Sequence, residues 1–173
     1  ERSMPSAAPR LVNELRDLQL RELVLHADET PVAMLAPGEG KTRRAYLFAY
    51  RSTGAHPSIV FDFCENRSGK HAQRFLDGYQ GALVVDDYSG YKALFAQGKI
   101  TELACWAHAR RKFYDLHVAG KSQIAEQTLK HIQELYAIEA HCRVLDIDTR
   151  KAYRQQHAKP KTDDIYRWLT TIR

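Results

Sequence analysis

The predicted fold is built around the stretch Gly81-Ala82-Leu83-Val84-Val85-Asp86-Asp87, in which five small or apolar residues end at two acids. A short, almost uninterrupted apolar run is typical of a strand that is buried on both faces. Such a strand lies inside a sheet, so the acids that follow it are expected at one edge of that sheet. The segments on either side of this stretch indicate what surrounds it.

Three apolar or aromatic segments precede this strand, and one follows it. The first three are joined by short connections that contain turn residues, which favours an antiparallel meander. Ser68 is predicted to cap a helix that Gly78 stops, and a short helix is expected at residues 91–95. The strands are expected at residues 23–28, 45–50, 58–63, 81–85 and 100–106.

This order predicts an α/β fold with a mixed five-stranded sheet and flanking helices. It is the ribonuclease H-like arrangement, although other α/β folds share the pattern. Residues 1–21 are expected to form a helical lead-in, residues 22–118 the core, and residues 119–173 a helical insertion region. An amphipathic stripe runs through that last region, and Thr162 is predicted to cap its final helix.

Composition narrows the class of protein. The chain has 173 residues, a net charge of +5 and three cysteines, and its isoelectric point is about 9.1. The charge is a weak indication of a polyanionic partner. No window approaches about 18 uninterrupted apolar residues, so no membrane-spanning helix is expected. The N-terminal residues contain no apolar run of the signal-peptide type, and sparse cysteines in an odd number are typical of reduced cytosolic thiols.

Asp28 and Asp86 are the candidate catalytic residues. Each is predicted at the end of a strand, and in the proposed fold the two strands are neighbours. Two adjacent carboxylates repel each other, and a divalent cation removes that cost. Hard oxygen ligands suit Mg²⁺ or Mn²⁺, and paired ions of this kind promote phosphodiester displacement. The alternative is that either residue only caps a helix or stabilises a turn.

Three segments resemble signatures of the insertion sequence 66 family of transposases. They are His26-Ala27-Asp28-Glu29-Thr30-Pro31-Val32, Val85-Asp86-Asp87-Tyr88-Ser89-Gly90-Tyr91 and Cys105-Trp106-Ala107-His108-Ala109-Arg110-Arg111-Lys112-Phe113. The likeness runs from about Leu25 to Phe113 and then more weakly through the helical tail.

This resemblance implies the catalytic core of a DDE transposase that cleaves and transfers DNA strands with Mg²⁺ or Mn²⁺. It implies Asp28 and Asp86 as two of three metal-binding acids, with Asp87 as a fallback for Asp86. The third, a Glu in an Asn-Asn-x-x-Glu-like motif, has no match and is expected beyond Arg173, so this chain alone is expected to be inactive. A homo-oligomer assembled on transposon ends and target DNA, in the bacterial cytoplasm at the nucleoid, is also implied.

Cys105 and His108 raise the question of a zinc site. Zinc in proteins takes four ligands, commonly as two pairs. No second pair has the required spacing, so a structural role near the active site is the preferred interpretation. Arg110, Arg111 and Lys112 follow directly, and Lys41 lies in a second basic cluster in the first hairpin. These side chains are candidates for phosphate contacts, and the alternative is a solvated surface.

Two other functions stay open. A ribonuclease H-like nuclease or resolvase would use the same acids without strand transfer. The second is a non-catalytic remnant of a transposase that only binds DNA or only folds. This hypothesis stays open for the chain because the third acid has no match.

Overall fold

The computed structural model describes residues 7–120 and 122–172. The chain divides into two compact units between Cys105 and Trp106. The first unit contains the whole sheet, and the second is made of helices. The domain limits predicted at residues 21 and 118 stay predictions. In the described part of the chain, no helix has the length and apolar content needed to cross a membrane.

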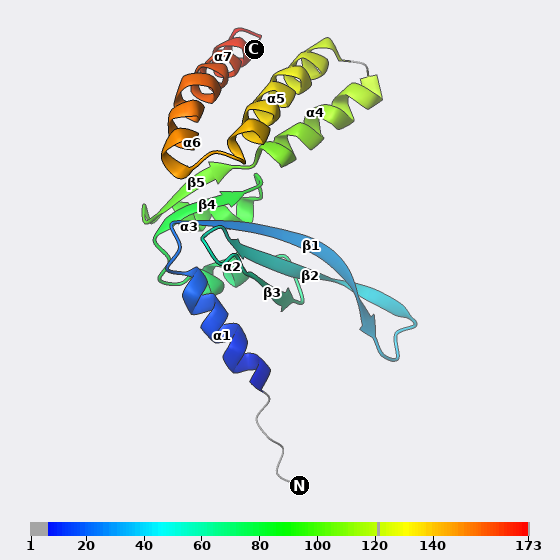
Figure 1. Ribbon diagram of the computed structural model, residues 1–173. Helices are drawn as coiled ribbons and strands as arrows, with labels where there is room; N and C mark the ends of the chain where they lie inside the picture. Colours follow the sequence, from blue (N-terminus) through cyan, green and yellow to red (C-terminus); the bar gives the residue numbers. More distant parts are fainter. Residues whose placement is uncertain (1–6, 121, 173) are drawn as a thin grey trace. The chain divides into compact units, whose positions relative to one another are not determined.

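The first unit is an α/β structure with a mixed five-stranded sheet, as the sequence predicts. Its strands are β1 (Val24–Ala36), β2 (Lys41–Ser52), β3 (Ile59–Cys64), β4 (Gly81–Val85) and β5 (Ile100–Ala104). Their order across the sheet is β3-β2-β1-β4-β5 (Figure 1). The first three strands pair antiparallel, and β4 pairs in parallel with both β1 and β5. The ribonuclease H-like order of elements is therefore present.

β1 is longer than its sequence predicts. The expected end at Asp28 is wrong, because β1 continues to Ala36 and pairs with β2 along that whole length. Beyond the sheet the two strands form a ribbon that projects from it (Figure 1). Pro31 lies in this ribbon, opposite Tyr46. Proline is tolerated where a strand is an edge, and β1 has no β4 partner this far along. The proline therefore does not end the strand.

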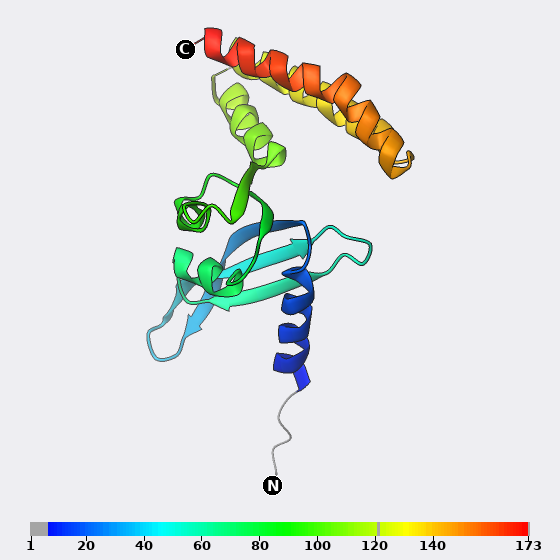
Figure 2. The ribbon, with the colours of Figure 1, turned by 90° about the vertical axis from the view of Figure 1, so that its left-hand side faces the viewer.

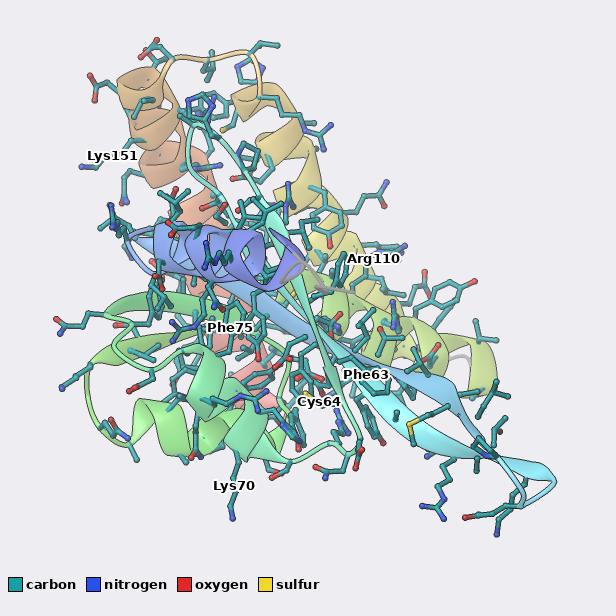
Figure 3. The ribbon with its side chains drawn as sticks, turned by 90° about the horizontal axis from the view of Figure 1, so that it is seen from below. Phe63, Cys64, Lys70, Phe75, Arg110 and Lys151 are labelled. Atoms are coloured by element: carbon teal, nitrogen blue, oxygen red, sulfur yellow. The ribbon has the colours of Figure 1, made fainter. Side chains whose placement is uncertain are left out.

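The core lies on one face of the sheet. Leu25, Phe48, Tyr50 and Leu83 have no measurable exposure and belong to one apolar cluster. The ring of Phe75 from α2 (Gly69–Phe75) stacks on Tyr50 at 3.7 Å between centroids. On the other face, large side chains of β3 are exposed, among them Phe63, which lies beside the buried Cys64 (Figure 3). The two faces of the sheet thus differ sharply in burial.

Short helices complete the first unit. α1 (Ala7–Gln19) lies within the predicted lead-in and is joined to the sheet by Gln19, whose Nε2 donates to the carbonyl oxygens of Tyr50 and Ser58. The predicted N-cap Ser68 is confirmed, since its hydroxyl accepts from the Lys70 amide. A 3₁₀ turn (Ser89–Tyr91, η1) and α3 (Lys92–Phe95) connect β4 to β5.

The second unit consists of α4 (Trp106–Gly120), α5 (Gln123–Cys142), α6 (Ile147–Tyr153), a π-helical turn (Arg154–Ala158, η2) and α7 (Lys159–Thr171). From α6 to α7 the helix is continuous and lies along α5 (Figure 2). Two corrections follow. Trp106 begins α4 and does not extend β5. Thr162 lies inside α7, where its hydroxyl donates to the Lys159 carbonyl, so it caps nothing. The π turn ends at Ala158, two residues before Pro160, which has no backbone donor for the helix.

Candidate active site

Asp28 and Asp86 lie just beyond the last paired residues of two neighbouring segments. In the parallel pair of β1 and β4, His26 is opposite Val84. Asp28 and Asp86 come two residues later on each segment, and residues two apart along a strand share a face. Asp28 is exposed while its neighbours Ala27 and Glu29 are buried, so this face is opposite the core. The register brings both acids to the carboxyl end of the parallel pair.

Each acid accepts one hydrogen bond from the backbone. Oδ1 of Asp28 accepts from the Glu29 amide at 2.9 Å, and Oδ1 of Asp86 accepts from the Tyr88 amide at 2.9 Å. The second bond stabilises a turn, so the structural role that the sequence left open is present at Asp86. An ionised carboxylate offers about four lone-pair positions. An amide bond of this kind does not by itself prevent a carboxylate from binding a cation.

Asp87 has different surroundings. Its side chain is 75% exposed and forms a 3.1 Å ion pair with Lys92, which also pairs with Glu102 at 2.6 Å. Asp87 follows the last β1–β4 pair by three residues, one more than Asp28 does. The preference for Asp86 over this fallback residue stays a prediction.

Behind the two acids is a polar network that sequence reasoning missed. Glu29 points into the core, where its side chain is only 1% exposed. Arg67 donates through Nε to Oε1 of Glu29 at 2.9 Å, and the Tyr91 hydroxyl donates to Oε2 at 2.7 Å. The signal was available, because an acid next to Asp28 falls on the core-facing side of a strand that alternates between its two faces.

The network shifts the ionisation of its members. Burial, followed by the hydrogen bond and charge of Glu29, raises the pKa of Tyr91 far above its usual range. The hydrogen bond to Glu29 raises the pKa of Arg67. Tyr91 is therefore a neutral donor and Arg67 a permanent cation. His26, on the opposite face, has a pKa that burial and the nearby Arg51 lower, which favours its neutral form.

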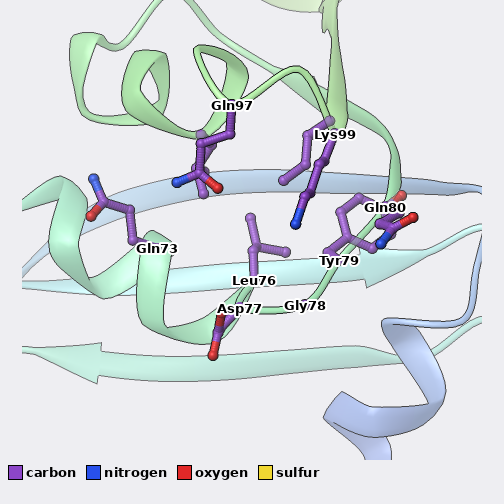
Figure 4. Close-up of a pocket in the computed structure, with 10 residues that line it drawn as sticks. Gln73, Leu76, Asp77, Gly78, Tyr79, Gln80, Gln97 and Lys99 are labelled. Atoms are coloured by element: carbon purple, nitrogen blue, oxygen red, sulfur yellow. The ribbon is translucent and has the colours of Figure 1, made fainter.

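A cavity of about 250 Å³ in the first unit is separate from the acids. Its wall includes Asp77, Gly78 and Gln80 before β4, and Lys99 before β5 (Figure 4). It therefore lies where these strands begin, whereas Asp86 follows the end of β4. It has no part in the site described above.

Basic residues gather in two places. Arg110, Arg111 and Lys112 are all exposed on α4, and the first two line an open groove of about 740 Å³ together with Tyr114 and Tyr136. The Arg110 guanidinium lies 5.9 Å from the centroid of the Tyr114 ring. Exposed arginines beside tyrosines are a combination that suits nucleic-acid backbones and bases.

The second basic cluster lies on the β1–β2 ribbon. Lys41 is exposed there, with its Nζ 4.0 Å from a carboxylate oxygen of Glu39, and Arg43 pairs with the same carboxylate. These exposed ion pairs are weak, and one carboxylate serves two cations. The cluster keeps a net positive charge.

Comparison with known proteins gives the family. Residues 4–173 match the family described as "Transposase IS66 family". The chain belongs to the IS66 family of transposases.

Three relatives of this IS66-family chain come from Sinorhizobium fredii (strain NBRC 101917 / NGR234). Uncharacterized protein y4qI is 40% identical over 143 residues, which are 75% of this chain and 26% of the relative. Uncharacterized protein y4hP is 33% identical over 86% of this chain and 31% of its own length. Uncharacterized protein y4jD is 34% identical over 78% of this chain and 29% of its own length. The chain spans between a quarter and a third of these relatives.

Cys105 and His108, in the third signature of the IS66 resemblance, lie on either side of the boundary between the two units. Cys105 follows β5 and is half-buried, and its amide donates to the Val85 carbonyl at 3.1 Å. His108 lies in the first turn of α4. Among the residues that the structure describes, no three His, Cys, Asp or Glu side chains are grouped so as to hold a metal ion. The structural role of this pair stays a prediction.

Proposed function

We propose that this chain is part of the catalytic core of an IS66-family transposase, which uses Asp28 and Asp86 for metal-dependent cleavage and transfer of DNA strands. The observation that supports this proposal is the register of β1 and β4. The His26–Val84 pair is followed two residues later by an acid on each segment. Family membership supports the transposase function, and the register supports these two residues.

The two acids fit a magnesium or manganese ion. Both offer hard carboxylate oxygens, and Mg²⁺ is commonly bound through one or two carboxylates, with waters and substrate phosphates completing its octahedron. Bound ions of this kind activate the attacking oxygen and stabilise the leaving oxygen in phosphodiester displacement. Asp28, which is exposed, and Asp86, which is half-buried, would hold the ion at the surface of the sheet, where DNA has access.

DNA is the proposed partner, and the exposed cations of α4 and of the β1–β2 ribbon are the proposed contacts. Arg110, Arg111, Lys112 and Lys41 would neutralise phosphates, and such contacts hold a duplex without reading its sequence. With two acids and without the third that the resemblance implies, we propose that the 173-residue chain binds Mn²⁺ weakly and does not cut DNA. Accurate placement of the metal ions is needed for rate.

The test compares this chain with a full-length IS66-family transposase that contains it, using terminal-repeat DNA and Mn²⁺. In the full-length protein, Asp28→Asn and Asp86→Asn should each lower the cleavage rate by about 1,000-fold or more, because misplaced groups cost orders of magnitude. DNA affinity should stay within a few-fold. Asp87→Asn separates Asp86 from its fallback, and Asp77→Asn, an exposed carboxylate before β4, controls for lost charge.

Three outcomes decide the proposal. Cleavage by the short chain that neither Asp28→Asn nor Asp86→Asn abolishes would show that the active site is elsewhere. If Asp87→Asn abolishes cleavage and Asp86→Asn retains it, the second metal ligand is Asp87 and not Asp86. Cleavage without joining of DNA ends would favour a nuclease or resolvase over a transposase.

A further inference from the structure

The backbone pairing between β1 and β4 ends before the acids. The ladder runs from the Val24–Ala82 pair to the His26–Val84 pair. β4 ends at Val85, and the chain then turns through Asp86 into η1. The relative position of Asp28 and Asp86 therefore depends on contacts other than the sheet ladder.

Glu29 supplies such a contact from the β1 side. Successive residues of a strand point to opposite faces, so Glu29 is anchored in the core while Asp28 faces outward. A buried carboxylate is costly unless its oxygens are paired and hydrogen-bonded. Both oxygens of Glu29 are used, Oε1 by Arg67 and Oε2 by Tyr91. The backbone at Asp28 is thereby fixed to two other segments.

Tyr91 and Tyr88 continue the connection to Asp86. The Tyr91 ring packs edge-on against Tyr88 with 5.6 Å between centroids. The Tyr88 amide is the donor to Oδ1 of Asp86. One buried carboxylate is thus linked, through two aromatic side chains three residues apart, to the turn that orients the second acid.

Arg67 closes the network from the loop before α2. Its guanidinium lies 3.9 Å from the centroid of the Tyr88 ring, and the Tyr88 hydroxyl donates to the Arg67 carbonyl. Next to it, the backbones of Gly69 and Gly90 are in close approach, since a Cβ built on Gly69 would collide with the Gly90 carbonyl oxygen. Residues 86–91 are therefore held on two sides.

We propose that Glu29, Arg67, Tyr88 and Tyr91, here called the Glu29 network, are positioning residues that set the placement of Asp28 relative to Asp86 for a shared divalent cation. The inference rests on the proposed function, because it assumes that these two acids bind one ion. The network acts by fixing the two acid-bearing segments where the sheet ladder no longer does so.

The experiment uses the 173-residue chain and Mn²⁺ as the probe. Mn²⁺ broadens the amide resonances of nearby residues, and this effect is measurable even for weak binding. In the unmodified chain, residues 27–29 and 85–88 should broaden together at the same Mn²⁺ concentration. In Tyr91→Phe and in Arg67→Met, roughly ten-fold more Mn²⁺ should be needed, as is typical when groups that orient metal ligands are removed. The two segments should then also broaden at different concentrations.

Two controls separate positioning from general stability. Arg74→Met breaks the exposed Arg74–Asp62 pair in the same unit and should leave the Mn²⁺ response unchanged. Glu29→Gln keeps a side chain that can accept from Tyr91, so its Mn²⁺ response should lie between those of the unmodified chain and Tyr91→Phe. Hydrogen exchange at the Tyr88 amide gives a metal-free readout and should be faster in Tyr91→Phe than in Arg74→Met.

The outcomes distinguish the inference from the proposed function. If Asp28→Asn removes the broadening while folded Tyr91→Phe and Arg67→Met behave like the unmodified chain, the acids bind the ion and the positioning role is wrong. If Mn²⁺ broadens neither segment of the unmodified chain, or Asp28→Asn has no effect, the shared ion site itself is wrong and the inference falls with it. Joint broadening that both network variants weaken supports the inference.

Discussion

Asp28 and Asp86 each lie two residues beyond the His26–Val84 pair, which is the last pair in the parallel ladder of β1 and β4. Glu29, the residue after the first acid, points to the opposite face and is buried among polar partners. These adjacent residues have different roles, because the Asp28 side chain faces solvent and the Glu29 side chain anchors the same backbone segment in the core. This arrangement permits an exposed acid to be held in a defined place.

The basic surface of α4 predicts a salt-dependent affinity for DNA. Replacing Arg110, Arg111 and Lys112 together by Ala should weaken duplex binding for all sequences. It should also reduce the slope of log K against log salt by roughly 0.9 for each phosphate that the protein no longer neutralises. Fluorescence anisotropy at several salt concentrations measures both effects. Lys151→Ala, which removes an exposed cation from α6, is the matched control, and a triple variant with an unchanged slope would remove α4 from the DNA interface.

Cys105 and His108 are predicted to bind no zinc, because a zinc site needs four ligands. Elemental analysis of the purified chain should therefore find zinc well below one ion per molecule. Cys105→Ser should leave that amount unchanged. Stoichiometric zinc that disappears in Cys105→Ser would show that the pair is half of a metal site.

The close approach of Gly69 and Gly90 predicts an asymmetric effect of two similar substitutions. Gly69→Ala should lower the free energy of unfolding by about 1–3 kcal/mol, because the new methyl group meets a backbone carbonyl that cannot move cheaply. Gly120→Ala, in α4, meets no atom within 4 Å and should be neutral or raise stability by up to about 1 kcal/mol. Urea denaturation measures both. Equal effects would show that the backbones of Gly69 and Gly90 leave room for a methyl group.

The thiol of Cys64 is predicted to ionise at a higher pH than an ordinary cysteine thiol. Burial first, and then the charge and hydrogen bond of Asp62, raise the pKa of its thiol to about 11 from an ordinary value of 9.0. Because the folded state keeps the proton longer, the stability from this thiol is complete below pH 9 and is lost as the pH rises to about 11. Thiolate absorbance in a Cys105→Ser/Cys142→Ser background measures the midpoint. Asp62→Asn should lower that midpoint and Arg74→Met should raise it, and shifts in the same direction would contradict this account.

The strands could be predicted because their signals are local. Residues 81–85 and 58–63 carry continuous apolar or aromatic side chains, and short connections forced the first three strands into an antiparallel meander. The N-cap at Ser68 also needs only its own neighbours, since its hydroxyl bonds to the Lys70 amide. These two strands and this cap depend on nearby residues, and the structure confirms them.

Features that depend on residues far away in the sequence were not predicted. β1 continues past Pro31 because β2 pairs with it from Leu25 to Ala36. The sequence around Pro31 does not indicate that pairing. Trp106 begins a helix although it directly follows β5, and Thr162 lies inside α7, which follows the π turn and contains Pro160. At Pro31 and Thr162, a residue type that usually marks a boundary lies inside a continuous element.

The sequence by itself determined the order of the strands along the chain and that an acid, Asp86, follows the fourth of them, because an apolar run and the residue that ends it are local features. Only the tertiary structure decided the parallel register of β1 and β4, whose last pair lies two residues before each acid, and only it showed Glu29 buried with Arg67 and Tyr91. Those three residues lie far apart in the chain, and a carboxylate enters a core only where folding brings its donors to it.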